Sequence, residues 1–204
     1  MHPSLVIPLV GMLYLLSFGA LSYMRRQGLS TRFAIEGLCI TAIGTAFTLA
    51  SVPVHPLPFL IVIYLVTMRV RLLVDIGNWL TSQKRHRQTL ALYRLALRLW
   101  PDPVSRQIVL INRGVTELCM QEPDIARVTI EEALANEEVQ PGARYLAAGY
   151  YNLGLACRRT GREAEAIRRF NQAIDTMPNS IYGRAANRAL RRRKSAEDSE
   201  TPKV

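Results

Sequence analysis

The side chains that could support catalysis are few and widely separated. The histidines are His2, His55 and His86, and the cysteines are Cys39, Cys119 and Cys157. Nucleophilic catalysis needs a serine or cysteine beside a base, and a metal site needs several ligands at suitable spacing. The sequence has no HExxH segment, no phosphate-binding glycine loop and no paired cysteines. We therefore expect no enzyme activity, no metal site and no other cofactor.

Glu36 could carry a proton through an apolar segment. It lies near the start of the run from Phe33 to Pro53, which has no other charge. Arg32 precedes it by four residues, and that spacing places both side chains on one face of a helix. We expect an interfacial ion pair between them, whereas a proton-relay role would suit a transporter or channel.

Charge is distributed unevenly along the chain. Its 204 residues include 26 Lys or Arg and 16 Asp or Glu, which gives a formal net charge of +10. Residues 1–87 hold 8 basic and 2 acidic side chains, whereas residues 88–189 hold 13 basic and 11 acidic ones. Nucleic-acid binding needs a basic face on a folded domain. Positive charge beside apolar segments instead favours anionic head groups, so we expect membrane lipids and no nucleic acid as partners.

Apolar segments occupy the first part of the chain. Residues 5–24 form an uncharged run that would span about 30 Å as a helix, the hydrocarbon thickness of a bilayer. A second span is expected over 33–53, before a turn rich in proline. A third is expected over 57–76 if its arginines extend to the head groups. The alternative for this third segment is a re-entrant or surface-lying helix.

The positions of the basic residues predict an orientation. Three spans place Arg25, Arg26 and Arg32 on the same side of the membrane as the basic residues at 69, 71, 84, 85 and 87, and leave the other side without Lys or Arg. The lipid-interface residues among them are Arg25, Arg26, Arg32, Arg69 and Arg71. By the positive-inside rule we expect a multi-pass protein of the cytoplasmic membrane, with its N-terminus outside and its C-terminal part in the cytosol.

The segment from Tyr150 to Pro178 carries aromatic, small and turn residues at fixed spacing. The set consists of Tyr150, Leu153, Gly154, Gly161, Ala166, Phe170, Ala173 and Pro178. The segment resembles the tetratricopeptide repeat, a pair of helices in about 34 residues. The small residues let the two helices approach closely, and Phe170 fills the groove between them.

Weaker copies of this pattern lie upstream. Residues 111–133 repeat it at a constant offset, with Gly114 in the place of Gly154 and Ile130 in the place of Phe170. This offset is longer than the usual repeat, and the extra residues fall in a longer connection at 137–142. Residues 87–100 form a half-copy, in which Tyr93 takes the place of Phe170. The first helix of this half-copy is either missing or supplied by the end of the last apolar segment.

The resemblance implies protein binding. Tetratricopeptide proteins hold an extended peptide or a helix on the concave surface formed by the first helix of each repeat. An Asn just before the Leu-Gly pair often contacts the ligand backbone in that family. The implied groove consists of Asn112, Val115, Leu118, Tyr151, Asn152, Leu155, Arg158 and Arg159. The alternative is that the asparagines only satisfy the repeat pattern and the arginines are solvated.

Together these patterns predict an all-α protein. A membrane domain with two to three transmembrane helices is expected over 1–82, a short tetratricopeptide-like α-solenoid over 83–193 and a disordered tail over 194–204. The predicted function is a membrane-anchored scaffold that binds a protein partner through its cytosolic repeats. The alternative is a small transporter or channel subunit with regulatory repeats.

Overall fold

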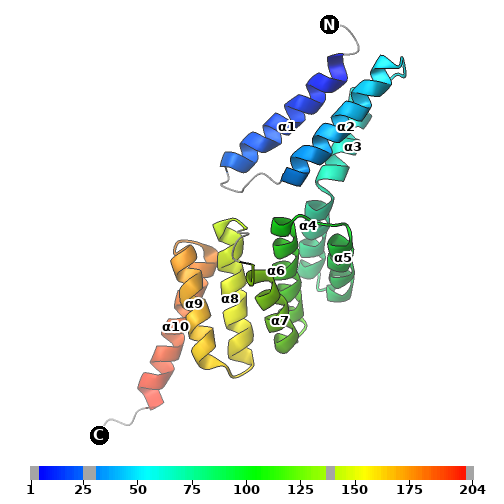
Figure 1. Cartoon of the computed structure of the whole chain (residues 1–204). Helices are drawn as coiled ribbons and strands as arrows, with labels where there is room; N and C mark the ends of the chain where they lie inside the picture. The colour runs from blue at the N-terminus through cyan, green and yellow to red at the C-terminus, as the bar shows by residue number, and fades with distance from the viewer. Residues whose placement is uncertain (1–4, 25–30, 137–140, 201–204) are drawn as a thin grey trace. The chain divides into compact units, whose positions relative to one another are not determined.

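The computed structural model describes residues 5–24, 31–136 and 141–200. The secondary-structure elements in these ranges are all helices, which agrees with the predicted all-α class (Figure 1). The chain forms two compact units, Met1–Leu73 and Val74–Val204. The boundary between them lies inside helix α4 (Arg69–Ser82), whereas the sequence suggested a boundary after residue 82.

The first unit contains α1 (Val6–Met24), α2 (Thr31–Leu49) and α3 (Pro56–Thr67). Each of these helices contacts the other two. Glycines mark the contacts: a Cβ added at Gly44 would lie 2.9 Å from the Phe59 ring, and Gly37 lies against Leu15. Close approach at small residues is typical of helices that pack within a bilayer.

The proline-rich turn separates α2 from α3. His55 is the N-cap of α3, and its Nδ1 accepts a hydrogen bond from the Leu57 N–H at 3.4 Å. Pro56 follows at the first helical position, where the missing N–H of proline leaves no helical bond unmade. The turn therefore ends one apolar helix and starts the next, as the sequence predicts.

The prediction of three spans is not confirmed. By length and composition, one helix of the described residues, α2, is able to cross a membrane, or two if the bent pair α3 and α4 forms one span. The apolar part of α1, Val6–Leu21, is shorter than this criterion requires. The third predicted span, 57–76, is interrupted because α3 ends at Thr67 after 12 residues, or about 18 Å.

The second unit is a series of helix pairs. After α4 it contains α5 (His86–Arg98), α6 (Pro103–Cys119), α7 (Pro123–Leu134), α8 (Ala143–Arg159), α9 (Glu163–Thr176) and α10 (Ile181–Glu200). From α5 onward, each helix contacts the next in sequence. Asp102 caps α6 by accepting the Ser105 N–H at 3.1 Å. Gly161 joins α8 to α9 in the left-handed region, at a φ of 75°, which glycine adopts without strain.

Within two of the pairs, a glycine on the first helix lies against a large side chain on the second. A Cβ added at Gly154 on α8 would lie 2.7 Å from the Phe170 ring on α9. Gly114 on α6 lies against Ile130 on α7 in the same way, and the separation in sequence is identical in both pairs. The predicted correspondence between these two segments is therefore confirmed by their packing.

The half-copy upstream is a complete helix pair. Gly77 on α4 lies against the ring of Tyr93 on α5, again with the same separation in sequence. The Tyr93 hydroxyl donates a hydrogen bond to Asn78 Oδ1 at 2.9 Å. The first helix of this pair is therefore α4, which includes the end of the third predicted apolar segment.

The last helix differs from the prediction at its C-terminal end. The backbone of α10 is helical through Glu200, whereas a disordered tail was predicted from residue 194. Residues 191–200 contain no glycine or proline, and Pro202 is the first helix breaker after them. Residues 201–204 lie outside the described part of the chain.

Candidate protein-interaction site

The first helices of the pairs lie side by side. Helix α8 contacts both α6 and α10, while α7 and α9 pack against them as the second helices. Helix α4 joins this row through a hydrogen bond between the hydroxyls of Thr81 and Thr116, at 3.2 Å. The structure therefore places α4, α6, α8 and α10 in one layer, as the resemblance implies for a binding surface.

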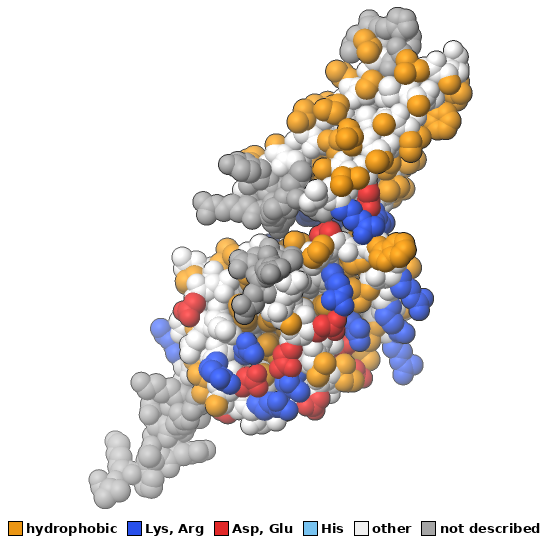
Figure 2. Space-filling model, in the orientation of Figure 1, with side chains coloured by type: hydrophobic (Ala, Val, Ile, Leu, Met, Phe, Trp, Pro, Cys, Tyr) orange, Lys and Arg blue, Asp and Glu red, His pale blue; other side chains and the backbone are white. Residues whose placement is uncertain are grey.

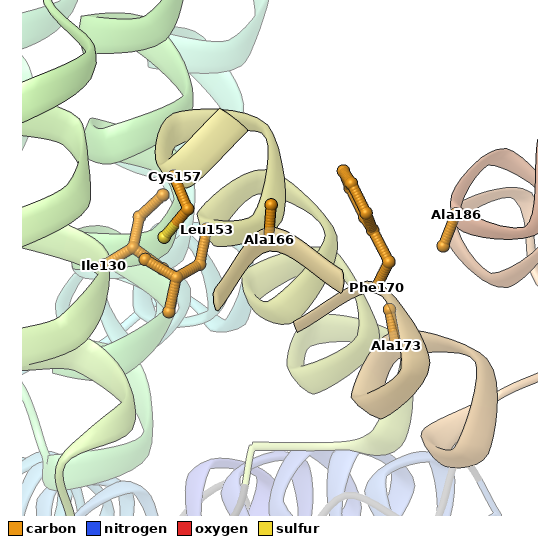
Figure 3. Packing of buried hydrophobic residues seen from close by; sticks show 7 residues of the cluster. All are labelled: Ile130, Leu153, Cys157, Ala166, Phe170, Ala173 and Ala186. Carbon is orange, nitrogen blue, oxygen red and sulfur yellow. The ribbon is translucent and has the colours of Figure 1, made fainter. Parts of the chain in front are cut away.

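A packed cluster holds this layer in place. Its buried members are Ile130, Leu153, Cys157, Ala166, Phe170, Ala173 and Ala186 (Figure 3). In Figure 3 the Phe170 side chain projects from α9 between Ala166 and Ala186, and its ring lies against Gly154 of α8. Tyr150 packs against the cluster from its edge, and Pro178 is exposed just after α9. The repeat residues predicted from sequence are thus mainly core residues.

The two asparagines expected to contact a partner bond to their own helices. Asn152 is 8% exposed, and its Nδ2 donates to the Ala148 carbonyl at 2.8 Å. Asn112 is half-buried and donates to the Ile108 carbonyl at 2.7 Å. Because it is buried, Asn152 offers little surface to a partner. The alternative interpretation, in which the asparagine only satisfies the repeat pattern, therefore describes Asn152 better.

The apolar groove residues differ in accessibility. Leu118 is buried at 5% exposure in a cluster with Ala126 and Ala156, so it does not line an open surface. Val115 and Leu155 are half-buried. Tyr151 is also half-buried, and its ring lies 5.9 Å from that of Phe170 and 6.1 Å from that of Tyr182. Val115, Tyr151 and Leu155 therefore remain as accessible apolar side chains.

The two arginines at the end of α8 are exposed but contact the fold. Arg159 Nη1 donates to the Leu118 carbonyl at 2.8 Å, which ties α8 to the last turn of α6. The Arg158 guanidinium lies 5.7 Å from the centre of the Phe170 ring, a cation–π contact. Both arginines thus have roles in packing beside any role in binding acidic groups.

Two polar features of this unit were missed from sequence. Glu117 is 2% exposed, and its carboxylate accepts a hydrogen bond from Arg113 Nε at 2.8 Å. Arg113 stands where the repeat pattern has Leu, and Glu117 follows it by four residues, which places both side chains on one face of the helix. The ion pair between them could therefore have been predicted from the sequence. The second feature is the Thr81 hydroxyl, which bonds Thr89 at 3.3 Å as well as Thr116. Thr81 and Thr116 both lie beside the Tyr93 hydroxyl, and burial raises the pKa of Tyr93 to about 12.

The predicted lipid-interface arginines fall into three groups. Arg32 Nε and Arg69 Nη2 both donate to Glu36 Oε1 at 2.8 Å, which confirms the predicted Arg32–Glu36 pair and adds a second partner from the start of α4. Arg71 is exposed. Arg25 and Arg26 lie outside the described residues. No group of three or more potential metal ligands occurs in the described part of the chain.

Comparison with known proteins agrees with this geometry. The family model described as tetratricopeptide repeat matches residues 105–179, which run from the first turn of α6 to just beyond α9. No curated protein matches the chain significantly. The resemblance proposed for Tyr150–Pro178 is therefore confirmed and extends upstream over α6 and α7. Tetratricopeptide repeats are typically units of protein–protein interaction.

Proposed function

We propose that this protein is a membrane-anchored scaffold that recruits a protein partner through its helical repeats. The observation that carries the proposal is the repeated glycine-to-large-residue packing in a segment matched by the tetratricopeptide family model. Each helix pair leaves faces that only neighbouring pairs or a partner can cover. An extended peptide or a single helix fits the row of first helices.

The polarity of the first unit supports anchoring. Its interior contains the buried hydroxyl of Thr41 and a hydrogen bond between Tyr14 and Thr67 at 2.7 Å. Its outer surface is apolar, with exposed leucine, isoleucine and phenylalanine distributed over its three helices (Figure 2). Polar groups inside and apolar groups outside suit a hydrocarbon solvent, because lipid gives a polar side chain no hydrogen-bond partner.

The ends of the first unit support an orientation. Arg32, Glu36 and Arg69 meet where α2 begins and α4 begins, whereas the proline turn at the other end carries no Lys or Arg. We place the basic end, with the repeats, in the cytosol and the N-terminus outside a cytoplasmic membrane. Anionic head groups would then contact Arg71 and the chain around Arg25 and Arg26.

Glu36 also bears on the transporter alternative. Its carboxylate accepts hydrogen bonds from two arginines, so its charge is already compensated within the unit. A proton carrier needs to gain and lose its proton during transport. The paired arrangement therefore favours a structural role for Glu36 and the scaffold over a transporter or channel subunit.

Site-specific photo-crosslinking in native membranes tests the scaffold. A photoreactive amino acid at Val115, half-buried on the first helix α6, should crosslink one discrete partner. The matched control is Val128, 56% exposed on the second helix α7, which should give no such product. Equal products from both positions, or none from Val115, would contradict the proposed surface. Extraction of the chain from membranes by alkaline carbonate would contradict the anchor.

A further inference from the structure

Helix α4 is the first helix in the row of helix pairs. No preceding repeat in the described part of the chain covers its outer face, and apolar residues on that face are exposed. In α8, Leu153 and Ala156 are fully buried in clusters that include residues of the preceding helix, α7. When Gly77 is aligned with Gly154, the equivalent residues of α4 are Ile76 and Trp79. They are 47% and 59% exposed. The face that α8 buries between repeats is therefore accessible on α4.

Basic side chains gather on the second helix of this pair, α5, and on the turn that precedes it. Between Asp75 and Asp102 the chain has no acidic residue and five exposed basic ones: Lys84, Arg85, Arg87, Arg94 and Arg98. The last three recur at spacings of seven and four, so they share one side of α5. Figure 2 shows basic side chains gathered over α5 next to hydrophobic ones.

Among the described residues, the charges of these five basic side chains are not compensated by ion pairs, as those of several arginines elsewhere in the unit are. None of them pairs with a carboxylate in the ranges that the structure describes. By contrast, arginines of later helices form ion pairs with glutamates, namely Arg106 with Glu132, Arg113 with Glu117, Arg127 with Glu131 and Arg169 with Glu165. The first helix pair therefore presents a concentrated positive charge to its surroundings.

Trp100 provides an independent observation. It follows the C-cap of α5 with a φ of 48°, in the left-handed region that favours glycine, and its side chain is 79% exposed. A left-handed conformation is unfavourable for a bulky residue, because its Cβ comes too close to the following carbonyl oxygen. An exposed indole held in such a conformation suggests a role outside the fold.

We propose that the α4–α5 surface binds the interfacial region of a bilayer that contains anionic lipid. This surface comprises the apolar residues Ile76, Trp79, Leu95 and Trp100 with the five basic side chains. Tryptophan is favoured at the membrane interface, and clustered Lys and Arg are attracted to anionic head groups. The proposal rests on the proposed membrane anchor.

Chain connectivity and charge favour this occupant. Only Met68 separates α3 from α4, and the 14 residues of α4 span about 21 Å, so the surface stays tethered near the end of an apolar helix. A second copy would bring two such basic surfaces together, which like-charge repulsion opposes. An acidic helix of another protein is the remaining occupant, and the experiment separates it from lipid.

Tryptophan fluorescence tests the proposal in the full chain, because Trp79 and Trp100 are its two tryptophans. The chain is assembled into nanodiscs whose lipids are brominated near the head-group end of the acyl chains. In discs that contain phosphatidylglycerol we expect quenched emission at short wavelength, with about twofold less quenching in phosphatidylcholine alone. Replacing Arg87, Arg94 and Arg98 by Gln should reduce quenching by about the same factor. The control, Gln at the exposed Arg184, Arg188 and Arg192 of α10, should leave quenching unchanged.

Three other outcomes overturn the inference. If the tryptophans emit at long wavelength and are quenched by acrylamide but not by the brominated lipid, the surface lies in water. Retention of the chain in the disc would still support the anchor in that case. Short-wavelength emission without lipid quenching would show that a protein covers the surface. A chain that fails to remain in discs would defeat the anchor as well. Trp100→Gly serves as a further check: it should preserve or raise the unfolding temperature yet weaken quenching of Trp79.

Discussion

Tyr93 lies against Gly77 as Phe170 lies against Gly154, and the two partners keep the same separation in sequence in both pairs. Both glycines occupy the first helix of a pair, and both rings occupy the second. The relationship identifies α4 as a repeat helix although its sequence continues the apolar segment before it. The helical repeats thus begin before the segment that the family model matches.

Adding a methyl group at either glycine should loosen its helix pair. A Cβ at Gly154 would lie 2.7 Å from the Phe170 ring, and a Cβ at Gly77 would lie even closer to the Tyr93 ring. We expect Gly154→Ala and Gly77→Ala each to lower the free energy of unfolding by about 1–3 kcal/mol. Thermal unfolding followed by circular dichroism in detergent measures the effect. Ala91→Ser, at an exposed position of α5, is the control, and a neutral Gly77→Ala would argue against α4 as a repeat helix.

Alkaline pH should destabilise the second unit through Tyr93. Burial raises the pKa of Tyr93 from 10.0 to about 12, so the folded chain keeps a proton that the unfolded chain loses. This contribution to stability is complete below about pH 10 and is lost as the pH rises through 12. Tyr93→Phe should lower stability at pH 7 by about 1 kcal/mol, because the bond to Asn78 is lost, but should flatten the decline above pH 10. An unchanged slope in the variant would exclude Tyr93 as its source.

The cysteines of the repeats should differ sharply in reactivity. Cys157 is fully buried, and burial raises its pKa to about 11, whereas Cys119 is exposed. Thiolate is the reactive form, so a maleimide at pH 7 should modify Cys119 quickly and Cys157 only when α8 opens. Mass spectrometry of timed samples measures both rates. Comparable rates under native conditions would mean that the core around Phe170 is not closed.

Arg159 should contribute to the contact between neighbouring pairs. Its hydrogen bond to the Leu118 carbonyl links α8 to α6 across 41 positions of sequence. Arg159→Ala should cost about 0.5–1.5 kcal/mol of stability. Arg162→Ala, at an exposed position three residues later, should have little effect. If both variants unfold alike, the role of Arg159 in packing fails and a role in partner binding gains support.

The helical repeats could be predicted because their signals are local. Gly154, Phe170 and Ala173 occupy fixed places in the repeat pattern, and a glycine at 161 interrupts the helix where α8 ends. The accessibility of the residues expected on the binding surface could not be predicted in the same way. Asn152 and Leu118 lie on the expected helices, yet the neighbouring helices bury them, and such burial depends on segments distant in sequence.

The sequence by itself determined the helical class, the repeat pairs and the Arg32–Glu36 contact, because each depends on residues close in sequence, within one helix or within two consecutive helices. The tertiary structure decided that α4 is the first repeat helix, that Arg69 joins Glu36 and that Trp79 is exposed while its equivalent Ala156 is buried. These facts depend on which helices pack against one another. Local periodicity does not encode that choice, since it comes from the fit of side chains brought together from separate parts of the chain.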